Sequence, residues 1–219
     1  IVEYKWDFDG DSVWDYSSTN QGNTTHEYHD DGNFKVKLHV KDDDGAVSED
    51  EVYINVLNTP PEVDLSVSST TVLTYEDVVF TWSTQDPDGN IISLIWDFDN
   101  DGYKDWQSQS PTVTTITHQY EDNGVYTAVF KVKDDDGDTT VKEANITVSN
   151  RAPTVDIQMD SSTVTSGRMV GIYVNGEDMD GYIMQYQWDF NGDGSWDETT
   201  SSNYAEHTYT TTGTYTLRV

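Results

Sequence analysis

Trp6-Asp7-Phe8 recurs as Trp96-Asp97-Phe98 and again as Trp188-Asp189-Phe190, after 90 and then 92 positions. A second block follows each copy in the same order: His26-Glu27-Tyr28, His118-Gln119-Tyr120 and His207-Thr208-Tyr209. A period of about 90 residues is the size of a small domain and is too long for a solenoid unit. The sequence therefore predicts three consecutive copies of one domain.

Two proline-containing linkers separate the copies, at Asn58-Thr59-Pro60-Pro61 and Asn150-Arg151-Ala152-Pro153. Proline stiffens such a connection. We expect domains at residues 1–58, 59–150 and 151–219. Compared with the middle copy, the first lacks its opening strands and the third its closing strand, so we expect the chain to be a window from a longer repeat array.

Apolar residues alternate with polar ones along several segments, as at Phe34, Val36, Leu38 and Val40. A period of two is typical of half-buried antiparallel strands, and Gly, Asp and Asn mark turns between them. We find no convincing helix and predict an all-β immunoglobulin-like sandwich of about seven strands per copy. Strands are expected at 52–56, 63–67, 78–82, 92–96, 144–148, 155–157, 170–174 and 184–188.

The charge of the chain is strongly acidic, with 41 Asp and Glu against 11 Lys and Arg, a formal net charge of -30. Such a field repels phosphate backbones and anionic membranes, which excludes nucleic acid as a partner. No 18-residue apolar run is present, so we expect no membrane insertion in this segment. The chain has no Cys. Small domains without disulfides often depend on bound metal, so we expect cations to stabilise the fold.

Each W-D-F block opens a loop with the spacing D-x-[DN]-x-D-[GS]-x-x-D. Oxygen ligands at positions 1, 3, 5 and 9 can surround one Ca²⁺, as in an EF-hand loop, although the Glu of position 12 is missing and the affinity should be weak. The alternative is a solvated turn, in which Asp tolerates unusual backbone angles. We predict calcium ligands at Asp7, Asp9, Asp11 and Asp15, at Asp97, Asp99, Asp101 and Asp105, and at Asp189, Asn191, Asp193 and Asp197.

Two further acidic sets precede glycines. One is Asp42-Asp43-Asp44 with its counterpart Asp134-Asp135-Asp136, and the other is Asp86-Pro87-Asp88 with its counterpart Asp178-Met179-Asp180. Asp-Gly chemistry explains plain turns here, which is the interpretation that we favour. Calcium bound at a domain joint is the alternative, and it would make the string of domains rigid.

No catalytic signature is present among the motifs for nucleophilic or metal-dependent hydrolysis, and the paired carboxylates recur in every copy. We therefore expect no enzymatic activity. Trp14, Trp106 and Trp196 lie inside the acidic loops, where they either pack over the loop or contact a ligand. Asn23 and Asn145 begin N-x-[ST] sequons and are candidate glycosylation sites in an exported protein.

The combination of W-D-F, H-x-Y, G-x-Y, D-D-D-G and N-x-x-P resembles PKD domains over nearly the whole chain. The acidic loop after W-D-F departs from the family's W-D-F-G-D-G. The resemblance implies an immunoglobulin-like sandwich of the kind found on cell surfaces, in surface layers and beside the catalytic domains of secreted hydrolases. It indicates architecture more firmly than purpose.

We expect a calcium-stabilised structural segment of an extracellular surface-layer, filament or adhesin protein, whose partners are neighbouring repeats or identical chains in a homopolymer. The alternative is an accessory module of a secreted hydrolase that binds a polysaccharide such as chitin, or a protein such as collagen, through loop aromatics. In both cases the location is extracellular or on the cell surface.

Overall fold

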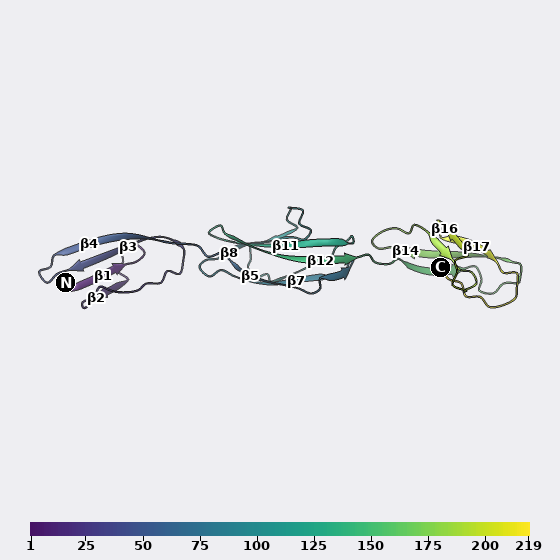
Figure 1. The fold of residues 1–219 in the computed structure, drawn as a ribbon, viewed down its shortest axis with the longest axis horizontal. Helices are drawn as coiled ribbons and strands as arrows, with labels where there is room; N and C mark the ends of the chain where they lie inside the picture. The colour runs from purple at the N-terminus through teal and green to yellow at the C-terminus, as the bar shows by residue number, and fades with distance from the viewer. The chain divides into compact units, whose positions relative to one another are not determined.

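The computed structural model describes residues 1–219 and consists of strands and loops, which confirms the all-β immunoglobulin-like fold (Figure 1). The chain divides into two compact units. The first contains Ile1–Thr70, Val79–His118 and Tyr126–Ile146, and the second contains Thr71–Val78, Gln119–Val125 and Thr147–Val219. No helix is present that has the length and apolar character needed to cross a membrane.

The first copy forms one antiparallel sheet of order β2-β1-β3-β4. Its strands are β1 (Glu3–Asp7), β2 (Tyr16–Ser18), β3 (Gly32–Lys41) and β4 (Val47–Val56). One face carries Phe34, Val36 and Ile54, of which only Val36 is buried. Ile54 is 39% exposed because no second sheet covers it, whereas Ile146 at the same place in the middle copy is fully buried.

The middle copy has two sheets. The three-stranded sheet has the order β10-β7-β5, and the five-stranded sheet has the order β6-β12-β11-β8-β9. Parallel pairing of β6 with the end of β12 places the second strand of this copy on the sheet opposite β5, as is usual in immunoglobulin-like sandwiches. The strands are β5 (Glu62–Val67), β6 (Thr71–Leu73), β7 (Val78–Gln85), β8 (Ile91–Asp97), β9 (Trp106–Ser108), β10 (Thr115–His118), β11 (Gly124–Asp134) and β12 (Thr139–Ser149).

Aromatic rings join these two sheets. Trp82 on β7 lies 5.7 Å from Trp96 on β8 and 4.9 Å from Phe130 on β11, measured between ring centroids. Trp96 and Phe130 stack at 4.6 Å, and both are fully buried. The W-D-F tryptophan is thus a core residue in this copy.

The third copy forms a sheet of order β13-β14-β17 and a two-stranded sheet of β15 and β16. The strands are β13 (Thr154–Met159), β14 (Met169–Glu177), β15 (Tyr186–Trp188), β16 (Glu198–Thr200) and β17 (Tyr204–Thr208). Trp188 again packs in the core, with Val170, Ile172 and Val174. The strand expected from Met184 begins only at Tyr186, because Met184 is 78% exposed and makes no ladder pair.

The H-x-Y block secures the W-D-F block of its own copy. The tyrosine hydroxyl donates to the phenylalanine carbonyl, at 2.9 Å for both Tyr28 to Phe8 and Tyr209 to Phe190. The histidines His26, His118 and His207 stack on the W-D-F phenylalanines at 4.4, 4.1 and 4.2 Å between ring centroids. The two sequence blocks that identify the repeat therefore touch in space.

Replacing Tyr209 by Phe should destabilise the third copy by about 1 kcal/mol, because the carbonyl of Phe190 loses the partner that satisfies it. Urea unfolding monitored by tryptophan fluorescence measures the change. The matched control is Tyr182→Phe, at a side chain that is 78% exposed. Equal effects of the two substitutions would show that the hydrogen bond from Tyr209 to the Phe190 carbonyl contributes nothing to stability.

Candidate metal sites

The W-D-F loops begin where a strand ends, so the first carboxylate of each loop is fixed by the ladder. Asp7, the last residue of β1, is 3% exposed. It accepts hydrogen bonds from the amides of Gly10 at 2.7 Å and Ser12 at 3.0 Å. Asp15 accepts from the amide of Phe8 at 2.6 Å and closes the loop.

The other two loops repeat this arrangement. Asp97 accepts from the amides of Asp101 and Gly102, and Asp189 accepts from those of Gly192 and Gly194. Closing bonds run from Phe98 to Asp105 and from Phe190 to Asp197. The turn position needs a positive φ, which is 90° at Gly102 and 91° at Gly194 but 72° at the non-glycine residue Ser12. Each of the first two loops therefore has one non-glycine residue at positive φ, Ser12 in the first and Asn100 (φ 60°) in the second, whereas the third loop has glycine at both positions.

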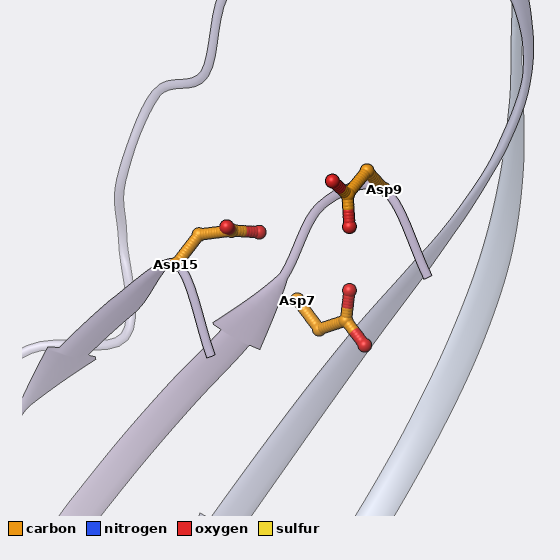
Figure 2. A group of neighbouring side chains, drawn as sticks. All are labelled: Asp7, Asp9 and Asp15. Atoms are coloured by element: carbon orange, nitrogen blue, oxygen red, sulfur yellow. The ribbon is translucent and has the colours of Figure 1, made fainter. Parts of the chain in front are cut away.

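Of the twelve predicted ligands, the structure gathers two groups of three carboxylates. The ligand oxygens within Asp7, Asp9 and Asp15, and within Asp97, Asp99 and Asp101, all lie within 4.8 Å of one another. Figure 2 shows Asp9 facing Asp7, which ends β1, while Asp15 reaches toward them from the start of β2. The third loop, with Asp189, Asn191, Asp193 and Asp197, gathers no such group of three carboxylates.

Backbone amides already satisfy many of these loop oxygens. Asp9, Asp11, Asp99, Asp101, Asn191 and Asp193 each accept from the amide two residues ahead. The amide of Ser195 lowers the pKa of Asp193, whereas burial raises the pKa of Asp99. Each loop thus consists of successive Asx turns that are stabilised by hydrogen bonds within the loop. A cation would bind to a turn that is already formed.

Carboxylates at the start of the middle copy differ from those of the loops because several of their oxygens are buried without a hydrogen-bond partner. Both carboxylate oxygens of Asp86, Oδ1 of Asp88 and Oδ1 of Asn58 are buried without a hydrogen-bond partner. Asn58 Nδ2 donates to Asp134 at 3.1 Å, and the amide of Thr59 donates to the other oxygen of Asp88 at 2.8 Å. We call Asn58, Asp86, Asp88 and Asp134 the joint cluster.

An unpaired buried carboxylate is costly, by several kcal/mol even after relaxation. Burial raises the pKa of Asp86, the backbone amide of Asp88 opposes this rise, and the neighbouring charges of Asp134 and Asp88 add to it. The W-D-F carboxylates are more tightly gathered, but the joint cluster holds the oxygens that lack partners. The carboxylates of Asp86, Asp88 and Asp134 do not all lie within 4.8 Å of one another, as those of the two W-D-F groups do. Their oxygens are nevertheless of the kind that a hard cation prefers, and a cation that drew them together would offset the penalty.

The plain turn interpretation does not explain the joint cluster, although it describes the first copy well. Asp42 accepts from the amides of Asp44 and Ala46 and simply closes a turn. Its counterpart Asp134 is fully buried, accepts from Gly137 and also contacts the linker through Asn58. The two loops have the same spacing along the chain, but the first copy contains no residues equivalent to Asn58, Asp86 and Asp88, which form the joint cluster with Asp134.

The second linker repeats part of this pattern. The amide of Arg151 donates to Asp180 at 3.0 Å, as the amide of Thr59 does to Asp88, and Asp180 Oδ1 is buried without a partner. The other oxygen of Asp180 accepts from the hydroxyl of Thr74 at 2.5 Å, and Nη2 of Arg151 donates to the carbonyl of Thr74 at 2.9 Å. The hydrogen bonds of Asp180, that from the Arg151 amide first, lower its pKa.

A further acidic group was missed from the sequence. Asp30, Asp31 and Asp136 bring their carboxylates within 4.8 Å of one another, and loss of solvation together with Asp31 raises the pKa of Asp136 to about 6. The available signal was the acidic pair directly before Gly32. Nothing in the linear pattern joins that pair to residue 136.

The profile of the PKD domain family matches residues 1–56 and 58–148, and a second PKD domain profile matches residues 154–219. The chain belongs to the PKD domain family. Its three PKD regions share the W-D-F block, which lies where a strand ends, and the H-x-Y block. In the first and third regions the tyrosine of H-x-Y donates a hydrogen bond to the phenylalanine carbonyl of W-D-F. All the matched profiles describe PKD domains.

Among curated proteins, the PKD chain is 31% identical over 106 residues to the pre-pro-metalloprotease PrtV of Vibrio cholerae. That match covers 48% of this chain and only 11% of PrtV. Among solved structures, the PKD1 domain of PrtV is 26% identical with a TM-score of 0.33, and the PKD1 domain of Vibrio anguillarum Epp is 24% identical with a TM-score of 0.31. Each match covers 42% of this chain and the whole of the other.

The loop tryptophans of the PKD regions differ in exposure. Trp106 is half-buried, with its ring 6.0 Å from that of Trp82, whereas Trp14 is 36% exposed and Trp196 is 52% exposed. The sequon residues Asn23 and Asn145 are both exposed, Asn23 in a loop and Asn145 on β12. Their glycosylation stays a prediction.

Lowering the pH from 7 to about 4.5 in the absence of divalent cations should make the contribution of Asp136 to the free energy of unfolding more favourable. The folded pKa of Asp136, about 6, lies above its ordinary value of 3.8, so the folded state binds the proton more tightly. Stability from this group is present at low pH and is lost as the pH rises through about 6. Thermal unfolding across this range measures the effect.

Asp136→Asn removes the titrating group, so the difference in stability between the parent chain and the variant should shift in favour of the parent as the pH falls from 7 to about 4.5. Asp43→Asn, at an exposed turn residue of the first copy, is the charge-matched control. A pH profile that Asp136→Asn leaves unchanged would contradict the assignment.

Proposed function

We propose that this chain is a calcium-stabilised structural segment of an extracellular protein, in which cations at the start of the middle and third PKD domains hold the linker to each domain. The observation that carries the proposal is the joint cluster, with four buried and unpartnered oxygens on Asn58, Asp86 and Asp88. The ligands Asp86, Asp88 and Asp134 supply negative charge, and Asn58 supplies a neutral oxygen from the linker. A cation there would tie the linker to β7 and β11 through their terminal loops.

The composition supports an extracellular setting. Calcium sites of extracellular modules bind with dissociation constants of about 0.1 to 1 mM and fill only where calcium is abundant. Bound cations also offset the net charge of -30, which otherwise opposes the compact state. The chain has no disulfide to replace them. Surface-layer, filament and adhesin proteins are the settings in which we place such a segment, with neighbouring repeats or identical chains as partners.

An accessory role beside a secreted hydrolase is the second candidate. It is supported by the similarity to part of a protein named a metalloprotease, of which the chain covers 11%, and by the 52% exposure of Trp196. Pull-down on insoluble chitin and collagen tests it, with Trp14, Trp106 and Trp196 each changed to Ala. Binding that depends on these residues would favour the accessory role over the structural one.

Calcium at 10 mM should stabilise the middle copy by about 1.4 to 2.7 kcal/mol, as expected for a ligand present at 10 to 100 times its dissociation constant. Differential scanning calorimetry should show a melting temperature several degrees higher than in EGTA. Asp86→Asn should remove most of this shift, because it neutralises the carboxylate with both oxygens buried and unpartnered.

The controls separate the joint cluster from the loops. Asp43→Asn makes the same charge change at an exposed turn and should leave the calcium shift intact. Asp97→Asn with Asp101→Asn tests the W-D-F loop of the same copy. If that pair abolishes the shift while Asp86→Asn does not, the ion belongs to the loop. A shift of zero in the parent chain would reject calcium as the stabilising ion.

A further inference from the structure

The two linkers of the chain have corresponding residues but different side-chain chemistry. Arg151 in the second linker occupies the position of Thr59 in the first. The amides of these two residues make the same hydrogen bond, from Thr59 to Asp88 at 2.8 Å and from Arg151 to Asp180 at 3.0 Å. The guanidinium group is therefore an addition that only the second linker has.

The side chain of Arg151 contacts the middle copy. Its Nε and Nη2 atoms donate to the carbonyl oxygen of Thr74 at 3.2 and 2.9 Å, so two N–H groups of the guanidinium share one acceptor. The hydroxyl of Thr74 donates to Asp180 at 2.5 Å, and the same carboxylate oxygen accepts the amide of Arg151. These three residues form a closed ring of hydrogen bonds, which we call the arginine latch.

Thr74 is a fixed point of the middle copy. It is fully buried, and its amide donates to the carbonyl of Ser149 at 3.1 Å. The amide of the next residue, Tyr75, donates to the carbonyl of Tyr120 at 2.9 Å. Tyr75 has a φ of 58°, which a bulky residue adopts only where its surroundings impose it. The latch and these contacts all lie in the second compact unit of the chain.

The first linker has no cationic side chain in this role. Four oxygens of Asn58, Asp86 and Asp88 are buried there without partners, whereas the second linker leaves only Oδ1 of Asp180 in that state. No salt bridge of the structure involves Asp86 or Asp88. Burial raises the pKa of Asp86, while hydrogen bonds, that from the Arg151 amide first, lower the pKa of Asp180. The protein's own groups thus stabilise ionised Asp180 but not ionised Asp86.

We infer that the arginine latch joins the third copy to the middle copy without a cation, so that the chain bends at only one of its two joints when calcium is withdrawn. A guanidinium group is always charged and is part of the linker itself, so its presence does not depend on the medium. A cation at Asp180 would add to the latch and is not needed to form it. The inference rests on the proposed function only at the first joint, residues 58–61, and concerns the second joint, residues 150–153.

The test measures one distance across each joint in the full 219-residue chain. Because the chain has no Cys, nitroxide spin labels can be attached to single introduced cysteines. Ser17, Gln107 and Thr199 are exposed and lie at matching positions on β2, β9 and β16. Ser17→Cys with Gln107→Cys spans the first joint, and Gln107→Cys with Thr199→Cys spans the second. Pulsed electron-electron double resonance gives the width of each distance distribution.

In EGTA we expect a broad distribution across the first joint and a narrow one across the second. Calcium at about 10 mM should narrow the first and leave the second nearly unchanged. Arg151→Thr, which copies Thr59, should widen the second distribution in EGTA about twofold, because domains on an untied linker move relative to one another. Arg168→Thr makes the same charge change at an exposed residue of the third copy and should leave that width unchanged.

Two results would overturn the inference. One is a distribution across the second joint that is as broad in EGTA as that across the first, and the other is a width that Arg151→Thr leaves unchanged. The comparison of the two joints in EGTA needs no change in the latch, so it decides the matter even if Arg151→Thr does not fold. A first joint that calcium fails to narrow would contradict the proposed function instead, while a narrow second joint that Arg151→Thr broadens would still support the latch.

Discussion

The burial of carboxylates without partners is the constraint on which the start of the middle copy depends. Asp86 and Asp88 lie beside Asn58 and Asp134, and three of their four oxygens have no protein donor. In water those oxygens would be hydrated, and in the fold they need a proton, a buried water molecule or a cation. The linker shares this need, because the Asn58 amide oxygen is buried in the same place. An ion bound to these oxygens would therefore stabilise the carboxylates and the position of the linker at the same time.

The same residue type solves a different problem in the W-D-F loops. There Asp side chains accept backbone amides at short range and shape a turn whose tightest position has a positive φ. The loops remain folded by their own hydrogen bonds. Asp is thus a turn former where amides face it and a candidate ligand where they do not, and the difference lies in the surroundings of the carboxylate.

The repeats keep their interior and vary their exterior. Trp96 and Trp188 occupy the same core position, and the histidine and phenylalanine rings stack in all three copies. On the outer face of the three-stranded sheet, the middle copy has Thr81 and Thr115 at the positions where the third copy has Tyr173 and Tyr204. A sandwich tolerates such changes because outward side chains do not enter its core. Separate functions can therefore be carried by domains that fold alike.

The fold class, the repeat and the blocks that make its core could be predicted from the sequence, because strand alternation and turn chemistry are local and recur three times. The same patterns proposed twelve ligands, of which the structure gathers two groups of three carboxylates. Only the folded chain shows that Asp86, Asp88 and Asn58 hold unpartnered oxygens, that Asp136 meets Asp30 and Asp31, and that Tyr173 pairs with Tyr204. Burial and cross-strand register join residues far apart in the chain, and spacing along the sequence does not encode those distances.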